Sequence, residues 1–123
     1  MVENDSVTAE LATAKRLVDF LEQDGYRIDT AVWVVDDEGS GRLYLVPHQV
    51  GRSNLQETIR VASTISAHKD ELPARHDLRY SIVDSKNPIV QAVRSAAVTR
   101  GRVRGIFKDG TYIDTAYVLR PAA

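Results

Sequence analysis

The sequence predicts an α+β fold, a single two-layer domain with a five-stranded mixed sheet and three helices. Its 123 residues are about the size of one domain, and 43% apolar and 27% charged residues are typical of globular proteins. Segments with the apolar spacing of helices alternate with short runs of β-branched and aromatic residues, and no linker divides them. The expected order over residues 1–123 is helix, strand, strand, helix, strand, helix, strand, strand, with residues 1–5 disordered.

The first helix is predicted over residues 6–24, because apolar residues recur there at helical spacing while charged residues fall on other faces. Gly25 follows at the position where helices commonly end in the left-handed conformation. Residues 28–36 form a run of β-branched and aromatic residues that is apolar on both faces, which predicts a strand in the interior of the sheet. A turn at 38–41 then leads to a second strand at 42–47, which should pair with the first as an antiparallel hairpin.

The second helix is predicted to begin after Ser53, because Gln56 three residues later completes the pattern of a capping box. The helix should continue to about residue 69 and bury its apolar stripe against the sheet. The stripe consists of Leu55, Ile59, Ala62 and Ile65. Residues 78–84 follow as a third strand, because apolar and polar residues alternate there.

The third helix is predicted from Asn87 and Pro88, which place a capping side chain before a proline in the first helical position. The chain then continues in two strands, at about 102–108 and 111–119. The Asp-Gly dipeptide at 109–110 lies between them and favours a tight turn, so these strands should form a second hairpin.

Two twelve-residue stretches, DGYRIDTAVWVV and DGTYIDTAYVLR, agree at six positions. Asp-Gly stops a helix in the first and turns a hairpin in the second, and the flanking sequences differ, so we favour convergence over internal duplication. Each stretch puts one carboxylate, Asp29 or Asp114, on an apolar strand, where burying it unpaired would cost several kcal/mol. We therefore expect these carboxylates at strand ends or paired. Candidate partners are Arg27, Arg102, Arg104 and Arg120.

The end of the chain also carries a resemblance to a known family. Residues 110–120 follow the pattern Gly-x-Tyr-Ile-acidic-x-Ala-Tyr-x-x-Arg. This pattern resembles the closing segment of a family of small bacterial α/β proteins of unknown function, and the likeness extends loosely over the leading helix, the strand with Trp33 and the central helix. Near the start of the central helix the relatives often have Gly-Pro, where this sequence has Gly51-Arg52. The resemblance implies the outline of the fold and assigns no catalytic residue.

Composition excludes several classes of function. The sequence has no cysteine, which removes disulfides, thiolate catalysis and cysteine-ligated metal sites, and suits a reducing compartment. No segment approaches the ~20 apolar residues that span a bilayer, and the acidic N-terminus has no apolar core segment. We therefore expect a cytoplasmic protein without a membrane partner.

Charge is distributed unevenly along the chain. Residues 1–72 hold 7 Lys/Arg against 13 Asp/Glu, a net of -6, whereas residues 73–123 hold 9 against 4, a net of +5. Such a division creates a basic face if the two parts stay separate in space, and it cancels if they interleave in one fold. Cancellation is the simpler expectation for a single domain.

Binding is the function that these patterns favour. We interpret the chain as a small non-enzymatic interaction domain that binds a protein partner or a second copy of itself, with no cofactor and no metal. Trp33, Tyr44 and Tyr80 are candidates to line a partly open face of the sheet, and exposed aromatic faces often become dimer interfaces.

Nucleic-acid binding is the first alternative. Arg102 and Arg104 are two residues apart and project from one strand face, with Arg100 and Lys108 close by in the sequence. Cations on one face can follow a phosphate backbone while bases stack on nearby rings, for which Phe107 and Tyr112 are available. A sequence pI of about 6.3 and the absence of a known nucleic-acid-binding motif argue against this reading.

A metal-dependent nuclease or small hydrolase is the second alternative. Asp84 and Lys86 have the spacing of a metal ligand beside a charge stabiliser, and Asp36 or Asp37 could add a second carboxylate for Mg²⁺. A polar turn before a helix explains the same residues. Asp29, Asp84 and Asp114 converging in one cleft would favour an enzyme. The three histidines lack the spacing of a zinc site and lie near element ends, and they are His48, His68 and His76.

Overall fold

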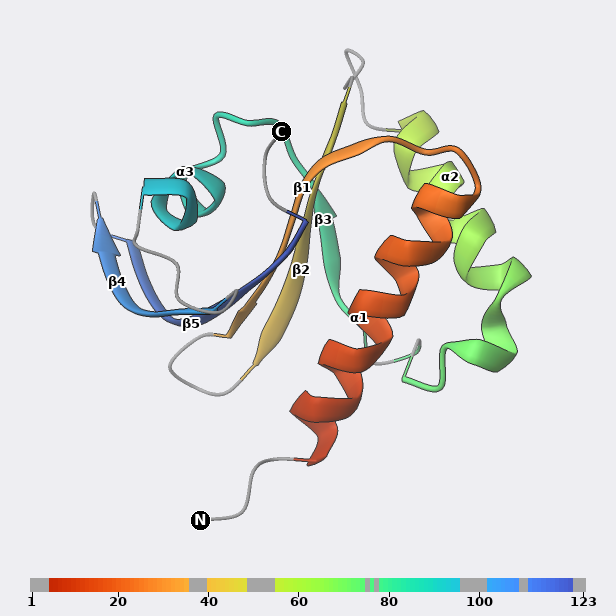
Figure 1. Cartoon of the computed structure of the whole chain (residues 1–123), viewed down its shortest axis with the longest axis horizontal. Helices are drawn as coiled ribbons and strands as arrows, with labels where there is room; N and C mark the ends of the chain where they lie inside the picture. Colours follow the sequence, from red (N-terminus) through yellow and green to blue (C-terminus); the bar gives the residue numbers. More distant parts are fainter. Residues whose placement is uncertain are drawn as a thin grey trace.

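The computed structural model describes residues 5–35, 40–48, 55–74, 76, 78–95, 102–108 and 111–120. Within these residues the chain is an α+β protein with three α-helices and one short 3₁₀ helix (Figure 1). In chain order the elements are α1 (Asp5–Gln23), β1 (Ile28–Val35), β2 (Gly41–Pro47), α2 (Leu55–Ala67), η1 (Lys69–Glu71), β3 (Tyr80–Ile82), α3 (Pro88–Ser95), β4 (Arg102–Lys108) and β5 (Thr111–Arg120). Residues 1–4, most of the segment expected to be disordered, lie outside this description, and Asp5 already belongs to α1.

The sheet has the strand order β3-β2-β1-β5-β4. Four strands, β2, β1, β5 and β4, form a continuous antiparallel body, and β1 lies between β2 and β5. The three residues of β3 extend this body in parallel beside β2, where Leu43 pairs with Tyr80 and Leu45 with Ile82. Backbone hydrogen bonds from Leu43 to Arg79 and from Val83 to Leu45 frame this short edge.

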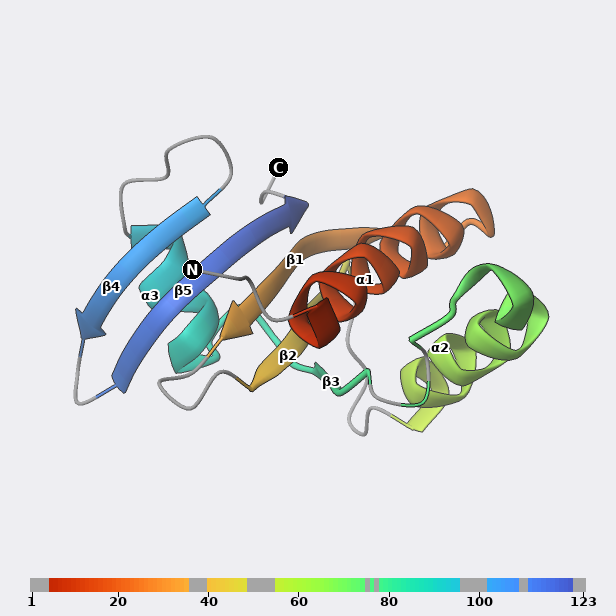
Figure 2. The ribbon, with the colours of Figure 1, turned by 90° about the horizontal axis from the view of Figure 1, so that it is seen from below.

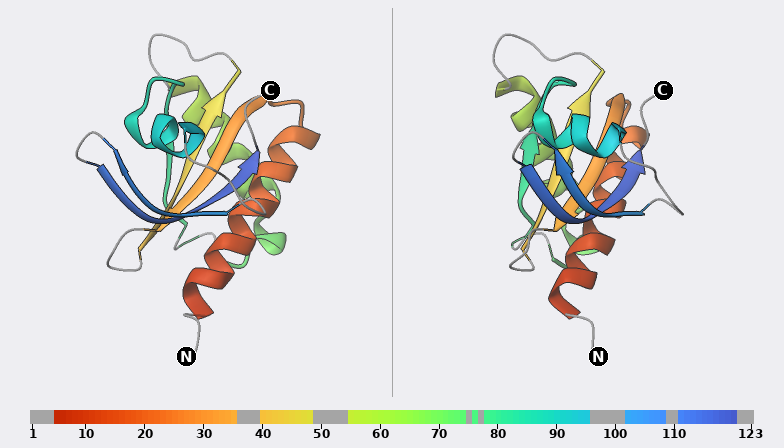
Figure 3. Two further views of the ribbon diagram at one scale, coloured as in Figure 1. Left: turned by 60° about the vertical axis from the view of Figure 1, so that its left-hand side comes forward. Right: turned by 90° about the vertical axis from the view of Figure 1, so that its left-hand side faces the viewer.

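The predicted two-layer domain is wrong, and only four of the five predicted strands form the main body of the sheet. Helices cover both faces, with α1 and α2 on one side of the sheet and α3 on the other (Figures 1 and 3). The main sheet is a four-stranded antiparallel body, and the third strand contributes three residues instead of the seven expected over 78–84. The physical reason is β1, which is buried along nearly its whole length and therefore needs cover on both faces.

The larger core lies between α1 and the sheet. Its buried residues include Leu17 and Leu21 of α1, Trp33 of β1 and Leu43 and Leu45 of β2, and all five are 0% exposed. The Trp33 indole lies against the backbone of its neighbour strand at Gly41, where an added Cβ would overlap three ring atoms. Close packing of this kind fixes the register of β1 against β2.

The smaller core lies on the opposite face, under α3. Val32 and Val34 of β1 pack there with Val93 of α3 and with Ile113 and Ala116 of β5. A hydrogen bond of 2.7 Å from the Arg94 guanidinium to the Thr30 hydroxyl joins α3 to β1, and Thr30 is 2% exposed. Alternate residues of one strand therefore serve two separate cores.

Local capping signals place the ends of two helices where the sequence predicts them. Gly25 has φ +86°, and the amides of Gly25 and Tyr26 donate to the carbonyls of Glu22 and Leu21, which is a Schellman motif. At the start of α3, the Asn87 side chain accepts hydrogen bonds from two amides of the first turn. Ser53 of the expected capping box lies outside the described residues.

The two similar stretches of sequence pair with each other. β1 and β5 are antiparallel neighbours, with Trp33 opposite Tyr117 and Val34 opposite Ala116. The prediction that both strands belong to one sheet is therefore confirmed. β4 and β5 also pair as expected, with Lys108 opposite Thr111, while residues 109 and 110 between them lie outside the description.

Helix α2 is attached mainly to α1 and lies beside it, on the outside of the molecule (Figure 2). Its buried residues are Val61 and Thr64. The chain after it returns along α1, where Leu72 is 0% exposed and the Ala74 amide donates to the Thr13 hydroxyl at 3.3 Å. With so few buried side chains, α2 has a large surface free of intramolecular packing.

Candidate functional site

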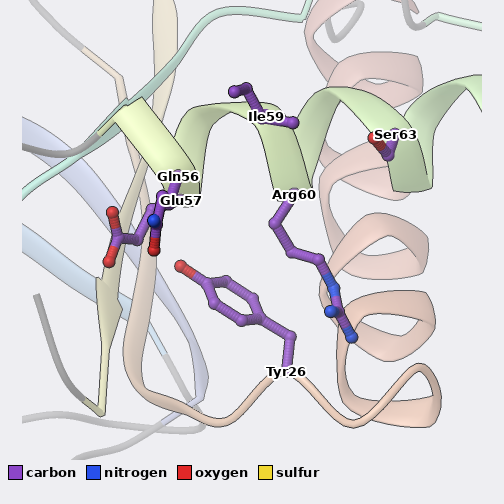
Figure 4. Close-up of a pocket in the computed structure, with 6 residues that line it drawn as sticks. All are labelled: Tyr26, Gln56, Glu57, Ile59, Arg60 and Ser63. Carbon is purple, nitrogen blue, oxygen red and sulfur yellow. The ribbon is translucent and has the colours of Figure 1, made fainter.

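An open pocket of about 330 Å³ lies between α2 and the turn that follows α1 (Figure 4). The turn contributes Tyr26, and α2 contributes the remaining side chains, which are Gln56, Glu57, Ile59, Arg60 and Ser63. In the close-up, Gln56 and Glu57 lie near the Tyr26 hydroxyl, and Ile59 points away from it. The pocket is therefore a recess beside a helix rather than an enclosed cavity.

Tyr26 forms the floor of this pocket. Its hydroxyl oxygen is buried and has no hydrogen-bond partner among the described residues. Burial, together with the nearby negative charge of Glu57, raises the pKa of Tyr26 to about 12, and the Arg60 cation acts in the opposite direction. The Arg60 guanidinium lies 5.8 Å from the ring centroid, which is within the range of a cation–π contact.

A polar junction around Asp24 holds α2 against the end of α1. The Arg60 guanidinium donates to the Asp24 carbonyl, and the Thr64 hydroxyl donates to Asp24 Oδ2 at 3.4 Å. His68 Nε2 lies 3.7 Å from the same carboxylate oxygen, and its Nδ1 lies 3.3 Å from Glu71 Oε2. The His68 ring also stacks on Phe20, with a centroid separation of 3.9 Å.

The order of groups in this Asp24 junction is not that of a catalytic triad. In a triad the hydroxyl contacts the histidine, and the carboxylate orients the histidine from its other side. Here Thr64 and His68 both point to one oxygen of Asp24, so the histidine does not receive the hydroxyl proton. The contacts of the Asp24 junction instead attach α2 to the end of α1.

Beside exposed Arg60, one side of α2 presents only uncharged side chains. Leu55 is 61% exposed and Ile59 is 55% exposed, one helical turn apart. The other exposed residues around the same direction are small or neutral. We call this set the α2 face, and it consists of Leu55, Gln56, Ile59, Ala62, Ser63 and Ser66.

The orientation of α2 corrects the sequence prediction. The predicted stripe was expected to be buried against the sheet, but Leu55, Ile59 and Ala62 are exposed. Only its fourth residue, Ile65, is partly buried and packs against the larger core. Val61 and Thr64 are buried instead, because they point toward α1 and the Asp24 junction. Sequence reasoning therefore missed the α2 face and the Tyr26 pocket. The absence of charge among the six face residues was the signal that could have indicated the surface.

A second, smaller recess of about 230 Å³ lies between α1 and β5. Lys15 and Asp19, one turn apart on α1, lie at its side, and Val118 and Leu119 of β5 complete it with Val18. Opposite charges one turn apart on a helix commonly stabilise the helix itself. The recess therefore needs no ligand to explain its composition.

The three predicted interface aromatics do not form one exposed surface. Trp33 is 0% exposed and belongs to the larger core. Tyr80 is partly buried against that same core, whereas Tyr44 is partly buried against the smaller core on the opposite face. The structure therefore separates these residues across the sheet, because Trp33 and Tyr44 face opposite sides of it.

The basic C-terminal hairpin stays a prediction. Arg100 lies outside the described residues, and the side chains of Arg102, Arg104 and Lys108 also lie outside the description. The backbone of β4 places these three positions at the edge of the sheet, with Arg102 opposite Tyr117 and Arg104 opposite Thr115.

The acidic residues considered for catalysis have structural roles where they are described. Asp84 Oδ1 accepts a hydrogen bond of 2.9 Å from the Lys86 amide, which fits a turn before α3. Asp29 lies at a register shift near the start of β1, and its carboxylate pairs with His48 Nδ1 at 3.1 Å. The expectation of a paired carboxylate is confirmed for Asp29, with a histidine instead of an arginine as partner. Asp36, Asp37 and the Asp114 side chain lie outside the description.

The histidines are also separated. His48 pairs with Asp29, His68 lies in the Asp24 junction, and His76 is exposed in the segment before β3. Among the described residues, no group of three or more histidine or acidic side chains is placed to hold a metal ion.

Replacing Tyr26 with phenylalanine should change how stability depends on pH. Unfolded Tyr26 loses its proton near pH 10, whereas folded Tyr26 keeps it to about pH 12, so rising pH stabilises the unfolded state across this window. Across this window the wild type should lose about 1–2 kcal/mol more unfolding free energy than the variant, after allowance for partial exposure. At neutral pH the two should differ by less than about 1 kcal/mol, because the hydroxyl makes no hydrogen bond within the described part of the chain.

Urea denaturation of both proteins between pH 8 and the upper end of that window measures this difference, with far-ultraviolet circular dichroism as the signal. A constant difference in unfolding free energy across the window would contradict the raised pKa of Tyr26.

No helix in the described part of the chain is long and apolar enough to cross a membrane. Comparison of the whole chain with protein-family models, curated proteins and solved structures finds no match.

Proposed function

We propose that the chain is a non-enzymatic binding domain that docks a protein partner on the α2 face. The observation that carries this proposal is the outward direction of Leu55 and Ile59, which are 61% and 55% exposed in the N-terminal half of the α2 face. A single exposed leucine is common on protein surfaces. An amphipathic helix that directs two large aliphatic residues away from its own core is typical of a binding surface.

The Tyr26 pocket supports docking better than catalysis. Arg60 is already engaged with the Asp24 carbonyl and the Tyr26 ring, and the Tyr26 hydroxyl is buried. These polar groups are therefore engaged or buried within the protein itself, and their effect is to shape the recess. A recess beside an apolar ridge suits a partner side chain inserted next to Leu55 and Ile59, as in the central pockets of protein interfaces.

The proposed location is the cytoplasm. The support is compositional, because the sequence contains no cysteine and so relies on no disulfide.

The test is site-specific photo-crosslinking, followed by a binding measurement with the captured partner. A photoreactive amino acid at position 55 should form adducts in cells, and the same group at Lys86, in the exposed turn before α3, should not. Mass spectrometry identifies the adduct, and the partner is then purified. Ile59→Glu should weaken its binding at least tenfold, because burying a carboxylate in an apolar contact is costly.

Lys86→Glu serves as the matched control in that binding measurement, since it also changes one exposed side chain and should leave affinity unchanged. Equal adducts from positions 55 and 86, or a purified partner that binds Ile59→Glu as tightly as wild type, would remove the α2 face as the docking site.

A further inference from the structure

We propose that α2 and η1 form a detachable strap, residues 55–71, which opens from α1 as a unit while α1, α3 and the sheet stay folded. Local opening of this kind is favoured where few apolar side chains are buried and many of the contacts are polar. The motion is a property of the chain alone and does not depend on which molecule binds the α2 face.

One row of side chains on the strap faces the end of α1 and the turn after it. The row consists of Arg60, Thr64 and His68, which follow one another at intervals of four residues and therefore lie on one side of the strap. Their contacts, taken in the same order, are with Tyr26, Asp24 and Phe20. The two segments therefore lie side by side and run in opposite directions.

The contacts of this row involve polar groups that water can replace. The Arg60 guanidinium lies 5.8 Å from the centroid of the Tyr26 ring, and the Thr64 hydroxyl donates to Asp24 Oδ2 at 3.4 Å. Both polar groups find similar partners in water once the contact breaks, so each contact contributes a small net free energy. The row therefore sets the direction of the strap more than it fixes the strap in place.

The apolar attachment of the strap is small compared with that of α1. Val61 is 0% exposed in the larger core, and Ile65 is partly buried against that core. In contrast, α1 contributes a row of buried residues to the same core, and they are Ala14, Leu17, Val18 and Leu21. We therefore expect α1 to remain on the sheet when the strap leaves it.

The strap ends at a fixed point on α1. Leu72, the next residue, is 0% exposed and belongs to the larger core. Two residues later the Ala74 amide donates to the Thr13 hydroxyl at 3.3 Å, and Thr13 is 1% exposed. This anchor confines the opening to the residues before it, so the strap can leave α1 without disturbing the chain that leads to β3.

Opening uncovers aromatic surface at the end of α1. The Phe20 ring loses the His68 ring that stacks on it, and the Tyr26 ring loses the Arg60 guanidinium. The Tyr26 hydroxyl lies near Glu57 of α2 and is buried in the closed structure, so it becomes accessible as well (Figure 4). The strap therefore controls access to two aromatic rings.

Thiol labelling at single cysteines tests the opening, and the lack of native cysteine makes each site unique. Val61→Cys places a buried thiol on the strap, and Leu45→Cys places a buried thiol in β2. Each rate with iodoacetamide is measured relative to the same variant unfolded in urea. The Val61→Cys thiol should react at least about tenfold faster than the Leu45→Cys thiol, because the strap opens more often than the sheet unfolds.

A distant core substitution separates local opening from global unfolding. Val93→Ala under α3 weakens the smaller core and should raise the labelling rate of Leu45→Cys at least about fivefold. The labelling rate of Val61→Cys should stay unchanged, because the open strap leaves the smaller core intact. Equal labelling of the two cysteines, or an equal rise of both rates with Val93→Ala, would show that α2 leaves α1 only by global unfolding and would reject the strap.

Asp24→Ala tests the row of polar contacts. Because this change removes the carboxylate that contacts Thr64 and His68, it should raise the labelling rate of Val61→Cys about fivefold. Asp70→Ala changes an exposed carboxylate of η1 and is the matched control, which should leave that rate unchanged. Equal rates in the two variants would reject the row as the contact that holds the strap.

Hydrogen-exchange mass spectrometry of the unmodified chain gives the same comparison without a cysteine. Amides of α2 should exchange at least about tenfold faster than amides of β1, after correction for their intrinsic rates. Exchange of both elements at one common rate would contradict the proposal. No partner enters any of these measurements, so their outcome is independent of the docking site proposed above.

Discussion

Replacing Gly41 with alanine should lower the free energy of unfolding by about 3 kcal/mol, the upper range for adding a methyl group to a packed core. The new Cβ would overlap the Trp33 indole at three of its ring atoms. The ring cannot move out of the way, because Trp33 is 0% exposed and surrounded by core side chains. Urea denaturation followed by circular dichroism measures the loss.

A double-mutant cycle with Trp33→Leu provides the control for Gly41→Ala. Leucine is smaller than the indole, so in that background the added methyl group should cost about 1 kcal/mol or less. An equal cost of Gly41→Ala in both backgrounds would show that the overlap with Trp33 is not the cause.

Replacing Leu17 with alanine should also lower the free energy of unfolding by about 3 kcal/mol. Leu17 is 0% exposed and packs α1 on the larger core, so truncation removes buried apolar surface and leaves a cavity. Because α1 also holds α2 through the Asp24 junction, looser packing of α1 should increase amide hydrogen exchange in α2. Urea denaturation and hydrogen-exchange mass spectrometry measure the two effects.

Lys15→Ala is the matched control on the exposed side of the same helix, and it should change stability by less than about 0.5 kcal/mol. A Leu17→Ala protein as stable as Lys15→Ala would contradict the assignment of Leu17 to the core.

Local signals in the sequence predict the order of the elements and several of their ends. Gly25 stops α1 because its φ of +86° suits glycine, and Asn87 starts α3 because its short side chain reaches two free amides. Both effects act within a few residues. For the same reason the antiparallel pairing of β1 with β2 follows from the short connection between them.

Features decided by contacts between residues far apart in the sequence could not be predicted in this way. Nothing near Pro88 in the sequence says that α3 covers the face opposite α1, although the two apolar faces of β1 required cover on both sides. The rotation of α2 was also ambiguous, because Leu55 and Ile59 form as good an apolar stripe as its buried residues. Contacts with Asp24, 36 residues before Arg60, decide between these two orientations.

The candidate site escaped sequence reasoning because it follows no spacing motif. Tyr26 belongs to a turn, and the residues that surround it come from a helix about 30 positions later. The selection of Trp33 from the sequence failed for a different reason. A large aromatic residue in a strand is a candidate for a binding surface, but the same size and strand preference place Trp33 in the core.

The adjacency of β1 and β5 has a consequence for how the chain folds. The two strands pair over Ala31–Val35 of β1 and Thr115–Arg120 of β5, although these segments lie far apart in the sequence. During synthesis, β1 can pair early with β2, but its second edge waits until β5 has been made. Such non-local pairing slows folding, and an apolar strand with an open edge invites contact with other nascent chains. Early folding intermediates should therefore aggregate more readily than the native protein.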